Sequence, residues 1–320
     1  MYGIFNLNKP AGVTSRDCVN QIQRMIRPVK CGHAGTLDPT ATGVLLVCAG
    51  PATRLMDLIH ESSKTYVAEF LLGIHSNTDD ISGELTAMES SVMLPNVASV
   101  QRQLQTLPGA VMQVPPAFSA VHINGQRAYQ VARDGGHVEL TAREVMIHSV
   151  QLQEAEVLTD PTSRDPRISD PVLRLSVEIT CGSGTYIRSI ARDLGRYFGC
   201  GGLMSALIRT RIGRFRIEDA IAPADLQPES LSQLMLPPQQ IVAELTHYSC
   251  TEREHLDFSC GRRIPVDPDR IRQTESPSAT SSLIAVLSDQ PEQLIALAEL
   301  RDGGRFLQPC TVFIRRLPRP

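Results

Sequence analysis

The 320-residue sequence contains no apolar run of the roughly 18 residues that a membrane-spanning helix requires. Its N-terminal stretch, M-Y-G-I-F-N-L-N-K-P, lacks both the basic and the apolar regions of a secretory signal peptide. The eight cysteines are scattered, without a C-x-x-C pair and without a histidine at metal-ligand spacing. We therefore expect a cytoplasmic protein with no structural zinc and no membrane contact, whose cysteines are reduced and mostly buried.

The motifs of several large enzyme classes are also missing. The sequence has no G-x-x-x-x-G-K-[ST] phosphate loop, no G-x-S-x-G nucleophile motif, no H-E-x-x-H zinc motif and no paired metal carboxylates. The segment G-S-G-T-Y (182–186) follows a predicted strand and precedes a predicted helix, but it lacks the third glycine of a dinucleotide-binding motif. Nucleotide-binding, hydrolase and metalloprotease chemistry therefore gain little support.

Lysine is scarce, since only three lysines occur and 28 of the 31 basic residues are arginines. Arginine binds phosphates and stacks on bases better than lysine does, although a GC-rich genome would favour arginine equally well. The net charge of −3 does not suggest a nucleic-acid partner, but arginines cluster in residues 209–216 and again in residues 301–320. We interpret the clusters either as solvated faces or as phosphate-binding patches.

Apolar periodicity and capping residues predict the main elements. A helix is expected from Thr14 or Ser15 to just before Pro28, because it starts on good N-cap residues and a proline follows its end. The irregular mixture of strands and helices favours a mixed sheet with helices. The other expected elements are a buried strand over 43–50, a short helix over 51–62, strands over 64–73 and 172–182, and a helix over 187–198.

The C-terminal part of the sequence has a different character. Residues 222–240 are rich in proline, glutamine and serine and are expected to connect two units. Short β-like runs separated by turns follow, and they predict a small β-rich C-terminal domain. Residues 160–171 and the stretch around 274–282 are expected to be flexible surface insertions.

Asp38 stands in the segment G-H-A-G-T-L-D-P-T-A-T-G (32–43), directly before a predicted buried strand. Aspartate followed by proline is common in turns, so a purely structural role is one interpretation. The order G-H-A-G-T-L-D-P-x-A-T-G-V-L, however, resembles the central motif of the tRNA pseudouridine synthase B family. Members of that family modify a uridine in the T-loop of tRNA, at position 55.

Further segments resemble the family's motifs and follow in the family's order. The resemblance covers residues 3–220 and, more loosely, a C-terminal RNA-binding domain of the PUA type. It implies an α+β pseudouridine synthase fold with a central mixed, largely antiparallel sheet flanked by helices. The catalytic domain would span 1–245, with an RNA-gripping thumb at about 115–145, and a PUA-like domain would span 246–320. The matching segments are N-L-N-K-P-A-G-V-T-S (6–15), K-T-Y (64–66), P-P-A-F-S-A-V-H-I-N-G-Q-R-A-Y (115–129), C-G-S-G-T-Y-I-R-S-I-A-R-D-L-G (181–195) and A-L-I-R-T-R-I-G-R-F (206–215).

The resemblance implies three catalytic residues. Converting uridine to pseudouridine breaks an N-glycosidic bond and remakes it as a carbon–carbon bond, so no redox change occurs and no cofactor or metal is required. Asp38 would be the nucleophile, attacking either the uracil ring or the ribose. Because burial disfavours a charged carboxylate, Asp38 needs a cation, and Arg188 would supply it. Tyr66 would stack on the extruded uracil and place its hydroxyl for proton transfer at C5.

The same resemblance implies a set of RNA-binding residues. His33 would fill the space that the everted nucleotides leave in the T-loop, and Tyr186 would pack beside the site. His122 and Arg127 lie in the thumb segment, and Arg209 and Arg211 in the basic strand.

Several neighbouring residues are given supporting roles. Asp80 would lie near the site without taking part in the reaction, and Lys9 would be structural or order a loop. Arg192 and Arg196, which follow Arg188 on the same helix, are expected at the surface.

Two positions depart from the family pattern. His122 stands where the thumb motif usually carries lysine, which puts one phosphate contact in doubt and makes a pH dependence of RNA binding plausible. Asn77 replaces an acid in the loop that usually has the pattern T-D-T-x-D. Neither change affects Asp38, Tyr66 or Arg188, so we expect activity to survive.

The sequence thus predicts a monomeric, stand-alone enzyme that acts on the T-stem-loop of tRNA without a protein partner. One alternative is a non-catalytic tRNA-binding or tRNA-folding protein with the same fold. Another is the catalytic subunit of a guide-RNA particle, although the expected extended basic tail is not seen.

Overall fold

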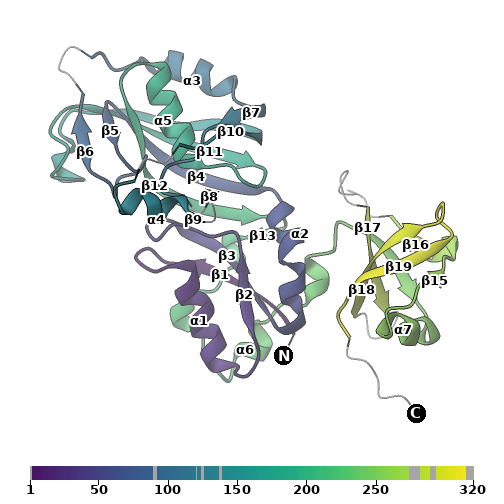
Figure 1. Cartoon of the computed structure of the whole chain (residues 1–320). Coiled ribbons are helices and arrows are strands. Elements are labelled where there is room, and N and C mark those ends of the chain that lie inside the picture. The colour runs from purple at the N-terminus through teal and green to yellow at the C-terminus, as the bar shows by residue number, and fades with distance from the viewer. Residues whose placement is uncertain are drawn as a thin grey trace.

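The computed structural model describes residues 2–88, 92–119, 121–123, 126–136, 139–273, 282–288 and 293–314. Within these residues the strands form a nine-stranded sheet, a six-stranded sheet and two short two-stranded sheets. Figure 1 shows helices packed around the large sheet, and the C-terminal six-stranded sheet set to one side of it. This arrangement confirms the predicted α+β class with a β-rich C-terminal part.

The large sheet is mixed and largely antiparallel, as predicted. Its strands are β1 (Gly3–Lys9), β2 (Cys31–Ala34), β3 (Thr42–Ala49), β4 (Lys64–Leu72), β7 (Gly109–Gln113), β10 (Arg143–Leu158), β11 (Val172–Cys181), β12 (Gly202–Ile212) and β13 (Phe215–Arg216). They follow the order β1-β3-β12-β4-β11-β10-β7, with β2 also paired to β3 and β13 to β12. Every pair is antiparallel except β3 with β12, which run parallel.

The three helices that capping and periodicity predict are present, and further helices occur that were not predicted. Those of the described residues are α1 (Ser15–Met25), α2 (Met56–Glu61), α3 (Val97–Gln105), α4 (Ala128–Arg133), α5 (Ile187–Tyr197), α6 (Leu231–Leu234) and α7 (Glu252–Ser259). Short 3-10 turns accompany them: η1 (Gly50–Leu55), η2 (Pro161–Ser163), η3 (Ile217–Asp219), η4 (Pro223–Asp225), η5 (Pro238–Gln240) and η6 (Pro268–Arg270). Two hairpins complete the set, β5 (Ile74–Ser76) with β6 (Leu85–Ala87), and β8 (His122–Ile123) with β9 (Gln126–Arg127).

The start of α1 illustrates how local sequence sets an element. The Thr14 hydroxyl accepts the Asp17 N–H (3.1 Å), and the Asp17 carboxylate accepts the Thr14 N–H (2.9 Å), which forms a capping box. One turn into the helix, Cys18, Val19 and Ile22 are buried against the inner residues of β1, β2 and β3. The helix therefore closes one face of the sheet beside the strand that follows Asp38.

Helix α5 lies unusually close to β12. A Cβ atom at Gly195 would stand 2.2 Å from the Gly202 nitrogen, so only glycine allows the helix and the strand to approach in this way. The apolar side of α5, including Ile190 and Leu194, packs into the core formed by β4 and β11. The close contact holds the C-terminal end of α5 against the sheet, and Arg188 lies about two turns earlier, at the start of the same helix.

The six-stranded sheet consists of β14 (Thr246–Cys250), β15 (Ile264–Pro265), β16 (Ile271–Arg272), β17 (Leu283–Ser288), β18 (Leu294–Arg301) and β19 (Phe306–Val312). It has its own apolar core and also shares a second cluster with the large unit. In that cluster Leu55 and Val242 pack with Leu287 and Phe313, and the Phe313 ring stacks on Tyr2 at 6.1 Å between centroids. The C-terminal sheet is consequently docked on the catalytic unit through buried side chains.

One segment expected at the surface also contacts a neighbouring loop. Most side chains of residues 160–171 are exposed, as expected, but Ile168 is 2% exposed and Arg167 donates hydrogen bonds to the carbonyl oxygens of Ile81 (2.7 Å) and Gly83 (3.1 Å). Nothing in the charged composition of the segment indicates this contact. The other expected insertion, around 274–281, lies outside the described residues.

Candidate active site

Asp38 lies on the loop that joins β2 to β3, and side chains from the N-terminal segment fix this loop. The Lys9 ammonium donates to the carbonyl oxygen of Pro39 (3.2 Å) and also to two carbonyls of its own segment. Ser15, at the start of α1, accepts the Leu37 N–H (2.9 Å) and donates to the Leu37 carbonyl (3.2 Å). Lys9 is therefore a loop-ordering residue, one of the two roles that the sequence left open.

Arg209 of β12 also supports this loop, through hydrogen bonds to its backbone. Its guanidinium donates to the carbonyl oxygens of Gly35 (2.9 Å) and Val44 (2.8 Å). The backbone of Gly43 has φ +102°, and a Cβ there would lie 2.2 Å from the Arg209 carbonyl oxygen. Glycine is required at this position both by the backbone conformation and by the parallel contact between β3 and β12.

Arg188 brings together the segments that form the site. It lies at the start of α5, its side chain is 7% exposed, and its Nε atom is 3.1 Å from the Asp38 carboxylate. The same guanidinium approaches the Asp80 carboxylate (3.4 Å) and donates to the carbonyl oxygens of Thr78 (3.2 Å) and Phe118 (3.1 Å). Since Asp38 remains 38% exposed, the cation is fixed while the carboxylate stays open to a substrate.

Asp80 is held as firmly as the arginine that it contacts. One of its carboxylate oxygens accepts the Thr78 hydroxyl (2.7 Å), the Ser82 N–H (3.0 Å) and the Ser82 hydroxyl (2.5 Å). The loop is also bound to β12, because the Ile81 N–H donates to the Met204 carbonyl (2.9 Å). Asp80 thus orients Arg188 and does not itself face the open side of Asp38.

Tyr66 of β4 reaches the site from the sheet. It is 9% exposed, and Arg209 donates a hydrogen bond to its hydroxyl group. Burial raises the pKa of the Tyr66 phenol, although the Arg209 charge acts in the opposite direction. The phenol is therefore the resting form of this side chain at neutral pH.

The three predicted catalytic side chains meet in one place. Asp38, Tyr66 and Arg188 line a cavity of about 110 Å³, together with Tyr186 and Leu207. The cavity combines a carboxylate, an arginine and aromatic and apolar walls, which suits a planar polar ring. The structure brings these residues together from separate parts of the chain, as the resemblance implied.

The structure places the predicted RNA-binding residues in different surroundings. His33 lies half-buried on β2, and Tyr186 lies at the N-cap of α5, where the Arg143 guanidinium stacks on its ring at 5.1 Å. Arg211 is partly exposed and donates to the Thr65 hydroxyl (3.3 Å). The side chains of His122 and Arg127 lie outside the described residues.

Arg209 requires a correction. It was expected to contact RNA, but it is 1% exposed and its hydrogen bonds go to the loop backbone and to Tyr66. Burial lowers the pKa of Arg209 from its ordinary value, the expected effect of removing a cation from water. Arg209 consequently acts beneath the cavity and not on its rim.

Arg192 also requires a correction, because it was expected at the surface. Its side chain is 6% exposed, and its guanidinium lies 2.9 Å from the buried Asp79 carboxylate and 2.8 Å from Asp193. Arg196, one turn further on, is exposed as expected. The signal that was missed is the spacing of four residues, which puts Arg188 and Arg192 on the same side of a helix.

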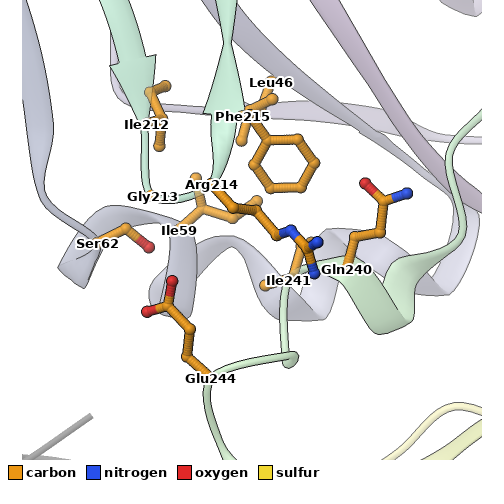
Figure 2. Close-up of a pocket in the computed structure, with 10 residues that line it drawn as sticks. All are labelled: Leu46, Ile59, Ser62, Ile212, Gly213, Arg214, Phe215, Gln240, Ile241 and Glu244. Atoms are coloured by element: carbon orange, nitrogen blue, oxygen red, sulfur yellow. The ribbon is translucent and has the colours of Figure 1, made fainter. Parts of the chain in front are cut away.

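A second cavity lies away from these residues. Figure 2 shows it beneath the turn between β12 and β13, with Arg214 and Glu244 at its edge and Phe215 and Ile241 among its walls. Its volume of about 20 Å³ would hold a single water molecule. Its place between the large sheet and the segment preceding β14 identifies it as a packing feature.

The described residues show neither a metal-binding cluster nor a membrane-spanning helix. No group of three His, Cys, Asp or Glu side chains within them is placed to hold a metal ion. No helix within the same residues combines the length and the apolar character needed to span a bilayer. Of the eight cysteines, six are buried, as predicted for core thiols.

Comparison with known proteins adds independent information. The model of the N-terminal domain of TruB family pseudouridylate synthases matches residues 23–187, and the model of the tRNA pseudouridylate synthase B C-terminal domain matches residues 188–242. The chain belongs to the TruB family of pseudouridylate synthases. Asp38 and Tyr66 fall within the first match, and Arg188 opens the second.

Similar TruB-family proteins cover most or all of the chain. A tRNA pseudouridine synthase B from Dehalococcoides mccartyi (strain CBDB1) is 35% identical over 100% of this chain and 99% of its own. The protein of the same name from Thermobifida fusca (strain YX) is 39% identical over 97% and 98% of the two chains. That from Synechococcus sp. (strain CC9311) is 39% identical over 82% and 85%.

Solved structures confirm the fold. A chain from the crystal structure of a Cbf5-Nop10-Gar1 complex superposes with a TM-score of 0.70 at 23% identity, covering 98% of this chain and 85% of that one. A chain from the structure of an H/ACA RNP bound to a substrate RNA containing 2'-deoxyuridine superposes with a TM-score of 0.69 at 21% identity, covering 98% and 86%. The pseudouridine synthase fold with a PUA-like C-terminal domain is thereby shown for this TruB-family chain.

Proposed function

We propose that this chain is a stand-alone, cytoplasmic tRNA pseudouridine synthase that isomerises uridine 55 in the T-loop. The observation that carries the proposal is the open Asp38 carboxylate, held 3.1 Å from a buried Arg188 in a cavity that Tyr66 also lines. The relatives that align with most of the length of this chain are named tRNA pseudouridine synthase B. A carboxylate, an arginine and an aromatic wall are the groups that the isomerisation requires.

The reaction starts with Asp38 as the nucleophile. Its carboxylate adds to C6 of the uracil or to C1' of the ribose, and the bond between N1 and C1' breaks. The uracil then turns so that C5 faces C1', and the new carbon–carbon bond forms. The bond to Asp38 breaks, which frees the carboxylate, C5 loses its proton to solvent, and N1 takes up a proton. The product therefore has the same composition as the substrate.

Arg188 stabilises the ionised form of the nucleophile. A carboxylate next to apolar walls loses hydration, and a fixed guanidinium offsets that loss. Because Asp80, Thr78 and Phe118 occupy its other donors, Arg188 stays in place when the exposed edge of Asp38 engages the substrate. Electrostatic stabilisation is strongest when the charged group is already oriented in this way.

Tyr66 acts on the uracil base and not on the ribose. Its ring forms part of the cavity wall, where it stacks on an extruded uracil. Since burial raises the pKa of this phenol, the neutral hydroxyl is the form that meets C5. A proton leaving C5 therefore passes through the hydroxyl group as a relay, with Arg209 stabilising any negative charge on the oxygen.

The test is a tritium-release assay on a T-stem-loop RNA that carries C5-tritiated uridine. The wild-type protein is expected to release tritium, whereas Asp38→Asn is expected to lose activity by about 10⁴-fold or more, as for the loss of a nucleophile in other enzymes. Asp57→Asn, a change of an exposed carboxylate on α2, is the matched control and should stay active. RNA binding by filter retention should be retained in Asp38→Asn.

Three results would contradict the proposal. A folded wild-type protein that binds the RNA but releases no tritium would indicate a tRNA-binding protein without catalysis. An Asp38→Asn variant that remains active would move the nucleophile to another residue. Release from a T-stem-loop whose target uridine is replaced by cytidine would show that the assigned position is wrong.

A further inference from the structure

The segment from Gln113 to Phe118 leads from β7 into the predicted RNA-gripping thumb, and α5 holds it at several points. The Gln113 side chain exchanges two hydrogen bonds with the Tyr186 backbone (2.8 and 3.1 Å). The Val114 carbonyl accepts the Ser189 hydroxyl (2.9 Å) and a guanidinium N–H of Arg192 (2.8 Å). The root of the thumb is therefore attached to the same helix that carries Arg188.

Arg192 binds three acceptors at once, each with a different nitrogen. Nη1 contacts the Asp79 carboxylate (2.9 Å), Nη2 the Val114 carbonyl (2.8 Å) and Nε the Asp193 carboxylate (2.8 Å). Lysine could not reproduce this planar fork. Because Arg192 and Asp79 are both about nine-tenths buried, the pair is screened little by solvent.

Asp79 helps to hold the shape of the acidic loop, which is formed by residues 77–84 between β5 and β6 and also carries Asp80. Its backbone has φ +61°, a conformation that non-glycine residues seldom adopt, and its carbonyl accepts the Met204 N–H (3.1 Å) of β12. The ion pair with Arg192 thus joins three distant segments: the loop that carries Asp80, the helix α5 and the root of the thumb at Val114.

We propose that Arg192 and Asp79 are positioning residues for RNA binding, which fix the root of the thumb to the catalytic helix. The inference rests on the proposed function, since it takes the thumb to be the RNA-gripping segment. Arg188 contacts Asp38 and serves the reaction, whereas the contacts of Arg192 go to the thumb root, the acidic loop and Asp193. Loss of Arg192 should consequently weaken RNA binding more than it slows the chemical step.

The experiment compares Arg192→Gln with Arg196→Gln, an exposed arginine one turn further along α5. In the tritium-release assay, Arg192→Gln is expected to raise KM for the T-stem-loop RNA by about tenfold, the effect of losing one charge-assisted contact, with kcat changed by less than about threefold. Arg196→Gln should match the wild type. In hydrogen exchange on the full chain, amides of residues 113–119 should exchange faster in Arg192→Gln, and those of β4 should not.

A second variant tests the same interaction in case Arg192→Gln does not fold. Asp79→Asn keeps the shape of the side chain and removes its charge, and it should raise KM in the same way. The double variant should be no worse than the worse single one, because both changes remove the same interaction.

Three results would overturn the proposal. They are a fall in kcat at unchanged KM, additive effects in the double variant, or unchanged exchange of residues 113–119. The exchange result does not depend on catalysis. A wild-type protein without activity would therefore count against the proposed function alone, while faster exchange would still support the attachment of the thumb root.

Discussion

His33 differs from an ordinary surface histidine. It is half-buried on β2, and burial lowers its pKa below the usual 6.5, with the charges of Arg209 and Arg16 acting in the same direction. The side chain is therefore neutral at physiological pH, which allows it to enter an RNA loop without bringing a charge. A neutral imidazole can stack on bases and both donate and accept hydrogen bonds.

This shift gives a testable pH dependence. The proton NMR signal of the His33 ring, assigned by its loss in His33→Gln, should titrate with a midpoint below 6.5. The unfolded chain binds the proton at the ordinary pKa while the folded chain does not, so folding stability falls as the pH drops from 6.5 through the folded pKa. That part of the decline should vanish in His33→Gln. A midpoint at or above 6.5 would contradict the burial of the ring.

The residues whose proximity the sequence anticipated are those that lie in a local motif. Asp38 and Arg188 each lie in a segment that resembles a family motif, and in the structure they are 3.1 Å apart. Arg209 was misplaced because β12 has an irregular register between Arg209 and Arg211, which turns one side chain inward and leaves the other partly exposed. No pattern of alternation in the sequence reveals such a bulge.

Arg192 was missed for a different physical reason. A helix face that carries arginines ordinarily faces water, but on α5 two segments from far along the chain cover it, the acidic loop and the thumb root. Burial of this kind depends on contacts between residues more than 70 positions apart. Propensity and periodicity describe only the helix itself.

At the scale of elements, the crossing of α5 and β12 is the point most sensitive to substitution. Gly195→Ala would place a Cβ atom 2.2 Å from the Gly202 nitrogen, against backbone that cannot move aside without displacing the helix. We expect the variant to lose about 3 kcal/mol of stability, the upper range for overpacking. Urea denaturation followed by circular dichroism measures the loss.

The matched control is Gly199→Ala, just beyond the same helix. Gly199 has φ +66°, but no atom lies within 4 Å of the added Cβ, so the cost is backbone strain of about 1 kcal/mol. Equal losses in the two variants would show that helix and strand can separate at little cost. In that case Arg188 would not be held by the crossing.

Most elements were predictable because their signals are short-range. The N-cap at Thr14 and the uninterrupted apolar run of β3 gave the correct helix and the correct buried strand. Residues 160–171 lie mostly at the surface, as predicted, but the contact of Arg167 with a neighbouring loop was not predicted, because a segment rich in aspartate, arginine and proline carries no sign of the partner that its arginines bind. Strand order was also beyond the sequence alone, although the irregular mixture of strands and helices already favoured a mixed sheet.

At the scale of the whole molecule, the C-terminal sheet depends on a small set of buried contacts. Phe313 is 5% exposed and stacks on Tyr2 from the other end of the chain. Phe313→Ala is expected to destabilise the docked C-terminal sheet by about 3 kcal/mol, the lower end of the range for removing a buried phenylalanine. Scanning calorimetry should show its unfolding transition moving to lower temperature.

The control for this prediction is Leu256→Ala on α7, a leucine that is 51% exposed. It should leave the transition close to that of the wild type, because little apolar area is removed from the interior. Equal shifts for the two variants would mean that the ring at position 313 adds nothing to docking. The attachment would then rest on the other members of the shared apolar cluster.

The position of β12 has a consequence for how the molecule comes into being. It is the last long strand of the large sheet in the chain, yet it lies between β3 and β4. Until β12 has been synthesised, the part of the sheet behind Asp38 and the part that carries Tyr66 lack the strand that joins them. The cavity cannot be complete before that point, because Met204 and Leu207 of β12 are among its lining residues.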